Sequence, residues 1–348
     1  MRQFYSVILS FFSLLCVFAS ASKASESGVI LLYHHVASET PASTSISPEN
    51  FKAHLEYLKA NDFNVMGLGE MVNALRVRRT LPEKSVAITF DDGYLSIYDT
   101  AFPMLNEFGF PFTVFVSTGP IDRAQSNYMS WGNIKEMASA GVTIANHLVE
   151  HPYMLDKLQG EAQVDWIERM REEILEAQQT ITRHSGQDNK FIAYPYGEYD
   201  NDIKSLVEEL GFIGFAQNSG SAGFSSDFLA LPRFPLASIY ANLSTAKVKF
   251  ATKAFNVEQL RPLSPVSSNS RPTATLKFST GDYRLNQIAC FSNNKPMIMN
   301  WSSSEEGVLT IVPEADLTGR RSRYICTAPD MKSDHFFWYS VQWIDLTH

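Results

Sequence analysis

The chain has 348 residues, of which 45% are hydrophobic and 19% are charged, so it is typical of a folded globular protein with room for more than one domain. Its formal net charge is −8 and it contains no basic run, so the sequence offers no electrostatic surface for nucleic acid. We therefore expect no nucleic-acid partner.

The N-terminus has the pattern of a secretory signal peptide. Arg2 precedes an uncharged apolar stretch over residues 4–18, and Ala19-Ser20-Ala21 provides a small-x-small cleavage site. We expect residues 1–21 to be removed and the protein to be exported, either to the periplasm or out of the cell. An uncleaved membrane anchor is the alternative. No later segment is apolar enough to span a membrane, so no transmembrane segment is expected after cleavage.

Apolar strands and amphipathic helices alternate along the next part of the chain. The sequence predicts strands over 28–36, 86–90, 112–119, 142–147, 191–194 and 212–216. It predicts one helix that begins at Ser47-Pro48, and further helices over 131–140, 161–183 and 200–210. This alternation is typical of a parallel sheet covered by helices, and the number of units favours an α/β fold of the distorted (β/α) barrel kind.

Polar side chains follow several of these strands. Catalytic groups in such barrels lie at the carboxyl ends of the strands. His34, Asp91, Asp92, His147 and Tyr196 all fall at or just beyond such an end. We therefore expect them to meet at one edge of the sheet.

The composition of the sequence changes near residue 261. Residues 261–272 are rich in proline and serine, as linkers are. Short strands without helices follow, which predicts a small β-sandwich accessory domain over 273–348 behind a catalytic domain over 22–260. Four aromatic residues there could form a sugar-binding platform or part of the core: Trp301, Trp338, Tyr339 and Trp343.

Two of the three cysteines lie in this C-terminal part, and Cys16 lies inside the predicted signal peptide. Disulfides persist in exported proteins, so we expect Cys290 and Cys326 to pair, with two buried free thiols as the alternative. Such a bond would stabilise the fold by roughly 3–4 kcal/mol.

Two histidines and a pair of acids suggest a metal site. His147 and His151 are four residues apart, a spacing at which both could face the same way on a helical turn. Together with one carboxylate of Asp91-Asp92 they would supply the three protein ligands of a hydrolytic zinc site. The second carboxylate would then be free to act as a general base. Each motif alone is weak, because surface histidines and Asp-Asp-Gly turns are common.

These residues resemble a known family. The segments 89–94 (Thr-Phe-Asp-Asp-Gly-Tyr), 147–151 (His-Leu-Val-Glu-His) and 194–197 (Tyr-Pro-Tyr-Gly) are similar to three motifs of the polysaccharide deacetylases, the NodB-homology or carbohydrate esterase family 4 enzymes. The resemblance covers about residues 29–235. It implies a distorted (β/α) barrel, in agreement with the strand and helix pattern.

The resemblance implies an activity and roles for the motif residues. A metal-bound water, activated by an aspartate base, would hydrolyse N-acetyl groups of an N-acetylglucosamine-containing polysaccharide or oligosaccharide and release acetate. The implied roles are Asp91 as base, Asp92, His147 and His151 as ligands of one divalent ion, most simply Zn²⁺, and Pro195 and Tyr196 in substrate and oxyanion binding.

The sequence departs from the family pattern in three places. Leu148 stands where Ser or Thr is usual, Ala193 replaces the arginine that orients the base, and the fifth-motif histidine has no clear counterpart. Residues 231–235 occupy that place, so Arg233 could orient the base or bind substrate.

Tyr33-His34 resembles a Tyr-His pair on the first strand of the periplasmic poly-N-acetylglucosamine deacetylases, a branch of this family. The resemblance nominates His34 as general acid, with His35 as the alternative. Trp131 could line a sugar subsite or belong to the core.

Two other function classes can be weighed on the same residues. Two histidines and a carboxylate also form the triad of non-haem iron oxygenases, but those sites leave a neighbouring acid such as Asp91 without a role. A carbohydrate-binding relative with impaired catalysis would explain Leu148 and Ala193, although all proposed ligands and the base remain. The sequence does not choose between β-1,6-linked poly-N-acetylglucosamine, chitin oligomers and peptidoglycan.

Overall fold

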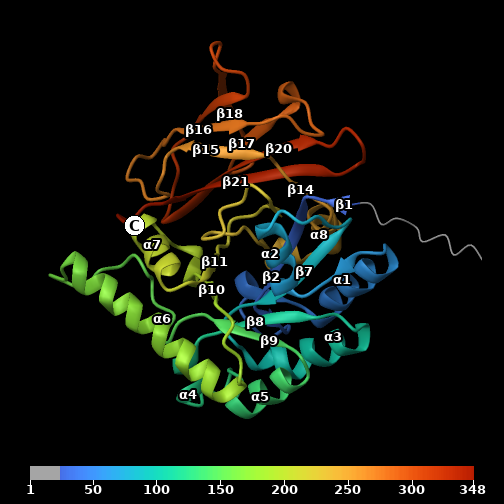
Figure 1. The fold of residues 1–348 in the computed structure, drawn as a ribbon, viewed down its shortest axis with the longest axis vertical. Coiled ribbons are helices and arrows are strands. Elements are labelled where there is room, and N and C mark those ends of the chain that lie inside the picture. Colours follow the sequence, from blue (N-terminus) through green and yellow to red (C-terminus); the bar gives the residue numbers. More distant parts are fainter. Residues whose placement is uncertain (1–23) are drawn as a thin grey trace, which may run out of the picture.

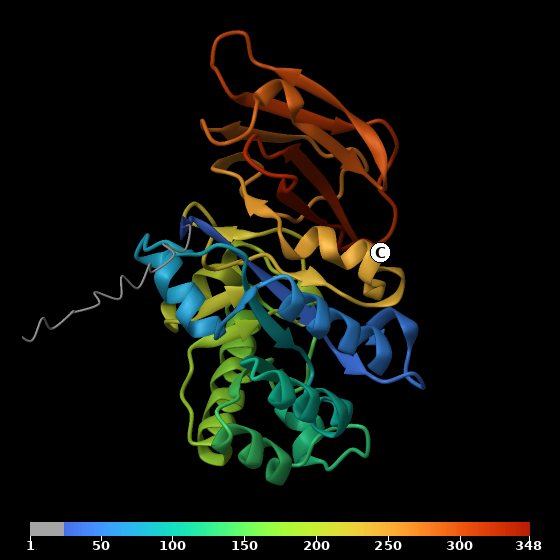
Figure 2. The same ribbon diagram turned by 90° about the vertical axis from the view of Figure 1, so that its right-hand side faces the viewer.

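A computed structural model describes residues 24–348, so the predicted signal peptide and Cys16 lie outside the described residues. The chain forms an α/β part, from strand β1 to helix α8, and an all-β part, strands β14 to β21, stacked on it (Figure 1). Helix α8 lies at the boundary between them (Figure 2). None of the helices in residues 24–348 is long and apolar enough to cross a membrane.

A curled, mostly parallel sheet organises the α/β part. Its strands, in the order β11-β10-β9-β8-β7-β2, are parallel to their neighbours. Their bounds are β2 Ser27–Tyr33, β7 Ser85–Phe90, β8 Phe112–Val116, β9 Thr143–Asn146, β10 Phe191–Ala193 and β11 Ile213–Phe215. Strand β12 (Ala222–Gly223) adds an antiparallel edge to β2. The α/β class predicted from the sequence is confirmed.

One short segment joins the two outer strands of this sheet. Leu231 pairs with Phe215 at the end of β11, and β13 (Phe234–Pro235) pairs with β2. Residues 231–235 therefore bridge β11 and β2 of the curled sheet, and Pro232 and Arg233 lie between the two pairings. The sequence alone did not place this segment beside β7.

Helices pack against both faces of the sheet, and alternate strand residues contact different helices. Leu31, Ile88 and Val114 belong to one apolar cluster with α1, α3 and α5, whereas Ile30, Ala87 and Phe115 belong to a second with α2, as expected for strands that are buried on both faces. The helix bounds are α1 Pro48–Ala60, α2 Leu68–Arg76, α3 Phe102–Phe108, α4 Thr118–Asp122, α5 Trp131–Ser139, α6 Gln163–Ser185, α7 Asn201–Glu209 and α8 Leu243–Phe250.

Local signals account for some of these boundaries. Ser47 caps α1 by accepting a hydrogen bond from the Asn50 N–H, with Pro48 at the first helical position. The strand expected over 112–119 ends earlier, at Val116, because Thr118 begins α4. Short strands complete the part: β1 Ala24–Ser25 with β6 Leu81–Pro82, β3 His35–Val36 with β4 Ser45–Ile46, and β5 Asn64–Val65 beside β7.

The all-β part is one hydrogen-bonded path of eight strands in the order β14-β21-β20-β17-β18-β19-β16-β15. Their bounds are β14 Lys253–Ala254, β15 Val257–Arg261, β16 Ala274–Phe278, β17 Ala289–Ser292, β18 Lys295–Trp301, β19 Val308–Pro313, β20 Arg321–Pro329 and β21 Phe336–Ile344. Strand β14 precedes the predicted linker and β15 ends at its first residue, Arg261, yet both strands belong to this sheet. The β-sandwich stays a prediction.

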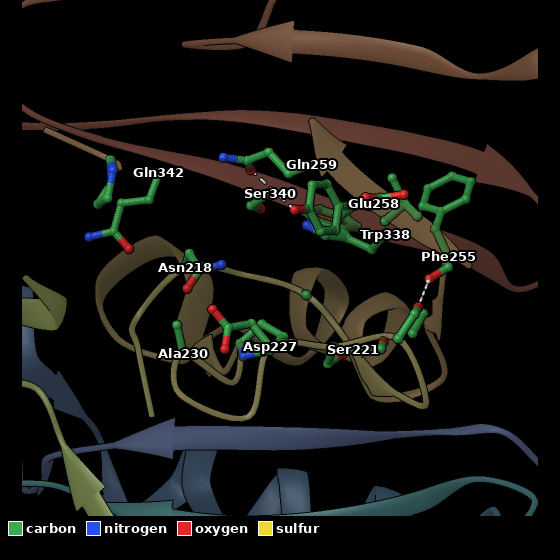
Figure 3. Close-up of a pocket in the computed structure, with 18 of the residues that line it drawn as sticks. Asn218, Ser221, Asp227, Ala230, Phe255, Glu258, Gln259, Trp338, Ser340 and Gln342 are labelled. Carbon is green, nitrogen blue, oxygen red and sulfur yellow. Dashed lines mark hydrogen bonds between the residues drawn. The ribbon is translucent and has the colours of Figure 1, made fainter. Parts of the chain in front are cut away.

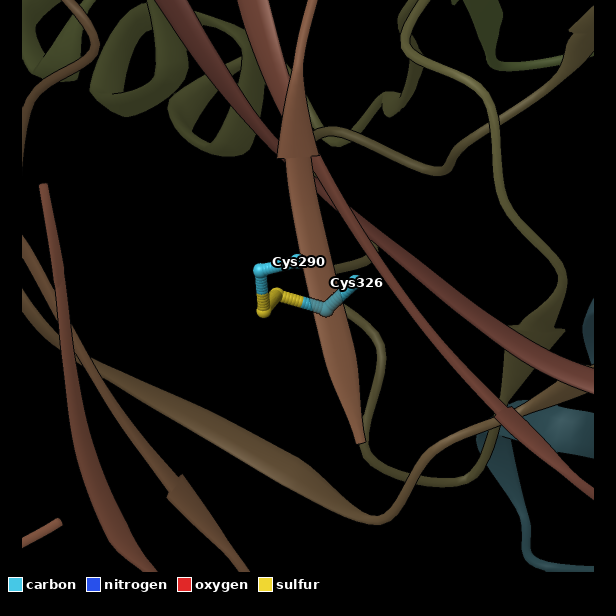
Figure 4. The surroundings of a disulfide bond; sticks show 2 residues. All are labelled: Cys290 and Cys326. Carbon is cyan, nitrogen blue, oxygen red and sulfur yellow. A yellow bond between two sulfur atoms is a disulfide. The ribbon is translucent and has the colours of Figure 1, made fainter. Parts of the chain in front are cut away.

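A disulfide joins neighbouring strands of this sheet. Cys290 of β17 and Cys326 of β20 are directly opposite each other in the antiparallel register, and their sulfurs are bonded (Figure 4). The predicted pairing is confirmed.

Strand β21 holds the two parts together, because its side chains point alternately into the all-β part and toward the α/β part. Trp343 and Val341 point into the core of the all-β part, whereas Trp338, Ser340 and Gln342 face the α/β part. The Gln342 amide donates to the Gly197 carbonyl at 2.6 Å. A cavity of about 540 Å³ lies along this boundary, where Asn218 and Asp227 face β21 (Figure 3).

Candidate metal centre and active site

Asp91 and Asp92 follow β7 at its carboxyl end and point in different directions. Alternation along the strand puts Thr89 and Asp91 on one face, and both are completely buried. Asp92 has a φ of 74°, a left-handed conformation that is uncommon for a residue other than glycine, and Gly93 continues the turn with a φ of 88°. This turn separates the two carboxylates, so that Asp91 meets Arg233 and Asp92 meets the histidines.

His147 and His151 come together on a loop, and the helical turn expected from their spacing is wrong. Residues 147–151 follow β9 without helical structure, and Leu148 and His151 have φ values of 68° and 53°. These two left-handed residues fold the loop back, so that the imidazole centroids lie 4.7 Å apart.

Buried polar groups hold this loop in place. The Asn146 side chain accepts from the Leu148 N–H at 2.8 Å, and Glu173 of α6 accepts from the N–H groups of Val149 and Glu150 at 3.0 Å. The Leu148 side chain is completely buried in an apolar cluster that includes Trp166 and Ile174. Leucine at this position therefore serves packing, and Asn146 secures the backbone.

The three predicted ligands converge on one point. The Nε2 atoms of His147 and His151 each lie 3.3 Å from Oδ1 of Asp92, and one ligand atom from each residue lies within 4.8 Å of the others. Nδ1 of His147 contacts the Ala193 carbonyl at 2.7 Å, which fixes this nitrogen as the donor. Its Nε2 is buried and has no hydrogen-bond partner among residues 24–348. A buried lone pair without a partner, beside a second imidazole and a carboxylate, fits a metal ion.

The electrostatics of the cluster favour positive charge between these groups. Burial alone would raise the pKa of Asp92, but the adjacent imidazoles of His147 and His34 hold it well below its usual value. Burial opposes charge on His147, yet the Asp91 and Asp92 carboxylates raise its pKa. Burial and the neighbouring His147 lower the pKa of His151 to about 4. The carboxylates therefore favour a positive charge on His147, whereas a second positive charge on His151 is unfavourable.

Arg233 binds Asp91 in the interior of the protein. Its Nη1 and Nη2 donate to the two carboxylate oxygens at 2.7 Å each, and Nε donates to the Ala216 carbonyl at 2.9 Å. Neither side chain of the pair is exposed. Burial by itself raises the pKa of Asp91, but the Arg233 guanidinium and the His147 imidazole bring it below its usual value. Arg233 thus orients the ionised carboxylate, a role for which Ala193 has no side chain.

His34 and His35 have different surroundings. The His35 ring stacks on Tyr94, with centroids 3.6 Å apart, and only 6% of the residue is exposed. His34 is half-buried, and its charge contributes to lowering the pKa values of both Asp91 and Asp92, after the larger effects of burial and of Arg233 or His147. Of the two histidines, His34 is the one still available to a substrate.

Tyr196 forms the rim of the site and is held from the all-β part. Its φ is 58°, its ring meets His151 edge-on at 4.6 Å, and it stacks on Tyr153 at 3.9 Å. The Arg321 guanidinium lies 5.2 Å from the centre of the Tyr196 ring.

Next to this rim lies Glu198, which is completely buried. It receives two hydrogen bonds of 2.8 Å from Arg320 and one of 3.1 Å from Arg321. The sequence did not point to these arginines, because nothing in the local sequence shows that β20 reaches the motif at 194–197.

Trp131 lies at the start of α5. Its indole donates to Asp122 at 2.7 Å and stacks on His184 with centroids 4.3 Å apart. These contacts join α5 to α4 and α6, and the sugar-subsite role stays a prediction. Pro195 is buried at the first position of the short 3₁₀ turn 195–197.

Comparison with known proteins agrees with this site. Residues 78–214 match the family model described as polysaccharide deacetylase. The chain carries a polysaccharide deacetylase domain. The matched range includes Asp91, Asp92, His147 and His151, and the resemblance and the enzyme class predicted from the sequence are confirmed.

Individual relatives match the same region. The YxkH protein of Bacillus subtilis is 28% identical over 205 residues, 59% of this chain and 69% of that protein. A poly-β-1,6-N-acetyl-D-glucosamine N-deacetylase of Staphylococcus aureus is 24% identical over 207 residues, 58% of this chain and 71% of that protein. The solved structure of IcaB from Ammonifex degensii is 26% identical, covers 66% of this chain and 98% of that chain, and has a TM-score of 0.56.

Proposed function

We propose that the chain removes N-acetyl groups from a polysaccharide or oligosaccharide that contains N-acetylglucosamine, releasing acetate and leaving a free amine on the sugar. The observation that carries the proposal is the pairing of a buried, ionised carboxylate, Asp91, with the neighbouring cluster of Asp92, His147 and His151. The match to the deacetylase family and the S. aureus relative that acts on poly-β-1,6-N-acetyl-D-glucosamine support this substrate class.

We propose that Asp92, His147 and His151 hold one divalent cation, and Zn²⁺ suits two imidazoles and one carboxylate with positions left open. Such a cation would polarise the amide carbonyl and make water more acidic. This three-residue set leaves Asp91 outside the cluster, because both of its oxygens are bound by Arg233.

The protein's own groups would then divide the proton transfers. Asp91 accepts a proton from the attacking water, and Arg233 keeps its carboxylate ionised and oriented. The backbone N–H of Tyr196 donates to the oxyanion that forms from the amide carbonyl, with Pro195 shaping the same turn. When the carbon–nitrogen bond breaks, His34 gives a proton to the leaving amine.

We also propose where the protein works and how it is divided. The pattern of residues 1–21 and the Cys290–Cys326 disulfide support export to the periplasm or the exterior. The catalytic domain would extend over about 22–260 and the accessory β-sandwich over 273–348, with β14 and β15 contributed by the residues before the linker.

The test is acetate release from an N-acetylglucosamine hexamer, with and without a chelator. We expect Asp91→Asn and Asp92→Asn to abolish turnover, whereas Asp99→Asn, an exposed carboxylate after the same motif, leaves it unchanged. Binding of the hexamer without acetate release by the metal-loaded wild type would show a carbohydrate-binding relative instead. Turnover that survives the chelator would exclude the metal assignment.

A further inference from the structure

A groove of about 660 Å³ lies between the deacetylase domain and the all-β part and reaches Tyr196 at the rim of the candidate metal site. We call it the interdomain groove and define it by Tyr196, Tyr240, Lys249, Arg321, Arg323 and Trp338, which all line it. Its volume is in the range of small-molecule binding sites. Because the Tyr196 ring also contacts the ligand His151, a chain held in the groove can continue into the catalytic site.

The charge of the interdomain groove is opposite to that of the protein. The chain as a whole has a formal net charge of −8, yet three basic side chains and no acidic one line the groove within the described residues 24–348. Lys249 comes from α8, and Arg321 and Arg323 come from β20.

Two of these cations lack a counter-ion in the protein. Across the part of the chain that the structure describes, neither Lys249 nor Arg323 has a carboxylate within 4.0 Å, whereas Arg321 shares Glu198 with Arg320. Lys249 is half-buried above the Tyr240 ring, 4.3 Å from its centre, and burial together with the nearby Arg323 lowers its pKa to about 8. Like charges held close together in a half-buried groove are unfavourable unless an anion is bound between them.

The remaining lining is suited to sugars. Tyr196, Tyr240 and Trp338 provide aromatic faces, and amide side chains such as Asn293 and Gln342 provide hydrogen-bonding groups. Trp338, Gln342 and Asn218 also line the neighbouring cavity of Figure 3, so the aromatic and amide surface continues along β21.

We infer that the interdomain groove binds anionic groups on an N-acetylated polysaccharide, through Lys249 and Arg323 with Arg321 at the end nearer the metal centre. The inference rests on the proposed function, whose substrate class it narrows to an acidic polymer. The anionic group is a sugar carboxylate or a phosphate or sulfate ester. A fully deacetylated stretch, which is cationic, is excluded from the groove by the same charges.

Calorimetric titration of the full chain tests this inference. The probes are a hyaluronan hexasaccharide, which alternates N-acetylglucosamine with a carboxylate sugar, its carboxyl-reduced form, and a chitosan hexamer. We expect hyaluronan to bind about tenfold or more tightly than the reduced form, and chitosan to bind least. A chondroitin sulfate hexasaccharide compared with unsulfated chondroitin distinguishes an ester anion from a carboxylate as the preferred group.

Variants test which side chains cause the preference for the anionic oligosaccharide. Lys249→Gln/Arg323→Gln should remove the preference for hyaluronan, whereas Lys247→Gln/Lys277→Gln removes two exposed charges from α8 and the all-β part and should not. Arg323→Glu should strengthen chitosan binding, a gain that a misfolded variant would not show.

Equal binding of hyaluronan and its reduced form, or an unchanged preference in Lys249→Gln/Arg323→Gln, overturns the inference. Acetate release from the neutral hexamer tests the proposed function separately. If acetate is released but hyaluronan and its reduced form bind equally, only the groove assignment fails. If hyaluronan binds more tightly but no acetate is released, only the deacetylase proposal fails.

Discussion

Replacing Arg233 by methionine should destabilise the protein strongly, because the change leaves the Asp91 carboxylate buried without its partner. The wild-type pair has two 2.7 Å hydrogen bonds and no exposed side-chain surface. Breaking a buried pair of this kind costs about 3–5 kcal/mol. The Ala216 carbonyl also loses its donor, which keeps the expected value in the upper half of that range.

Urea unfolding in the presence of chelator measures this free energy without a contribution from bound metal. The matched control is Arg171→Met, which removes two contacts with Glu209 at 2.8 and 2.9 Å and one with Glu168 at 3.2 Å. The Glu209 side chain is 61% exposed, so we expect a loss of no more than about 1 kcal/mol.

The double variant Asp91→Asn/Arg233→Met removes both charges. It should be more stable than the sum of the single losses predicts, with a coupling of about 2 kcal/mol or more. A loss below about 1 kcal/mol for Arg233→Met, or strict additivity in this double-mutant cycle, would refute the reasoning.

In activity assays, Arg233→Lys keeps the charge but not the two-pronged contact, and we expect kcat to fall by about one to two orders of magnitude with KM little changed.

Three further predictions concern other parts of the chain. Burial lowers the pKa of His54 from 6.5 to about 4, so the unfolded chain takes up the proton first and the free energy of unfolding should fall by about 3 kcal/mol between pH 6.5 and pH 4. His54→Gln should lack this part of the pH dependence. Cys290→Ser/Cys326→Ser opens a link between residues 36 apart, and denaturant unfolding should show a loss of roughly 4 kcal/mol. Arg320→Ala removes two bonds to the buried Glu198 and should destabilise the protein by about 3 kcal/mol and reduce turnover through the loop at 194–197.

Each of these three predictions has an outcome or a control variant that tests it. An identical pH profile for His54→Gln would show that this histidine is not the group whose proton uptake matters. Equal unfolding curves with and without reductant would contradict the disulfide contribution. Arg271→Ala, which breaks an exposed pair with Asp316, is the control for Arg320→Ala and should have almost no effect.

Short motifs and strand periodicity were enough to predict that most residues of the candidate metal site lie close together. Asp91 and Asp92 follow an apolar strand, and His147 follows another, so the rule that parallel strands end at one edge brings them together. The spacing of His147 and His151 predicted that they act together, but not how. Leu148 and His151 adopt left-handed conformations that no helical pattern indicates, and buried neighbours such as Asn146 hold them there.

Only the tertiary structure decided which residue binds the Asp91 carboxylate. The sequence showed that Ala193 lacks the usual arginine, and Arg233 was one candidate without a partner. Arg233 and Asp91 are 142 residues apart, and they meet because residues 231–235 bridge the two outer strands of the sheet. Likewise, α8 and β20 form the interdomain groove from segments whose local patterns carry no sign of each other. Periodicity along the chain records which face of a strand is buried, but the pairing of distant segments depends on how the whole sheet curls, and that is settled only when the chain packs.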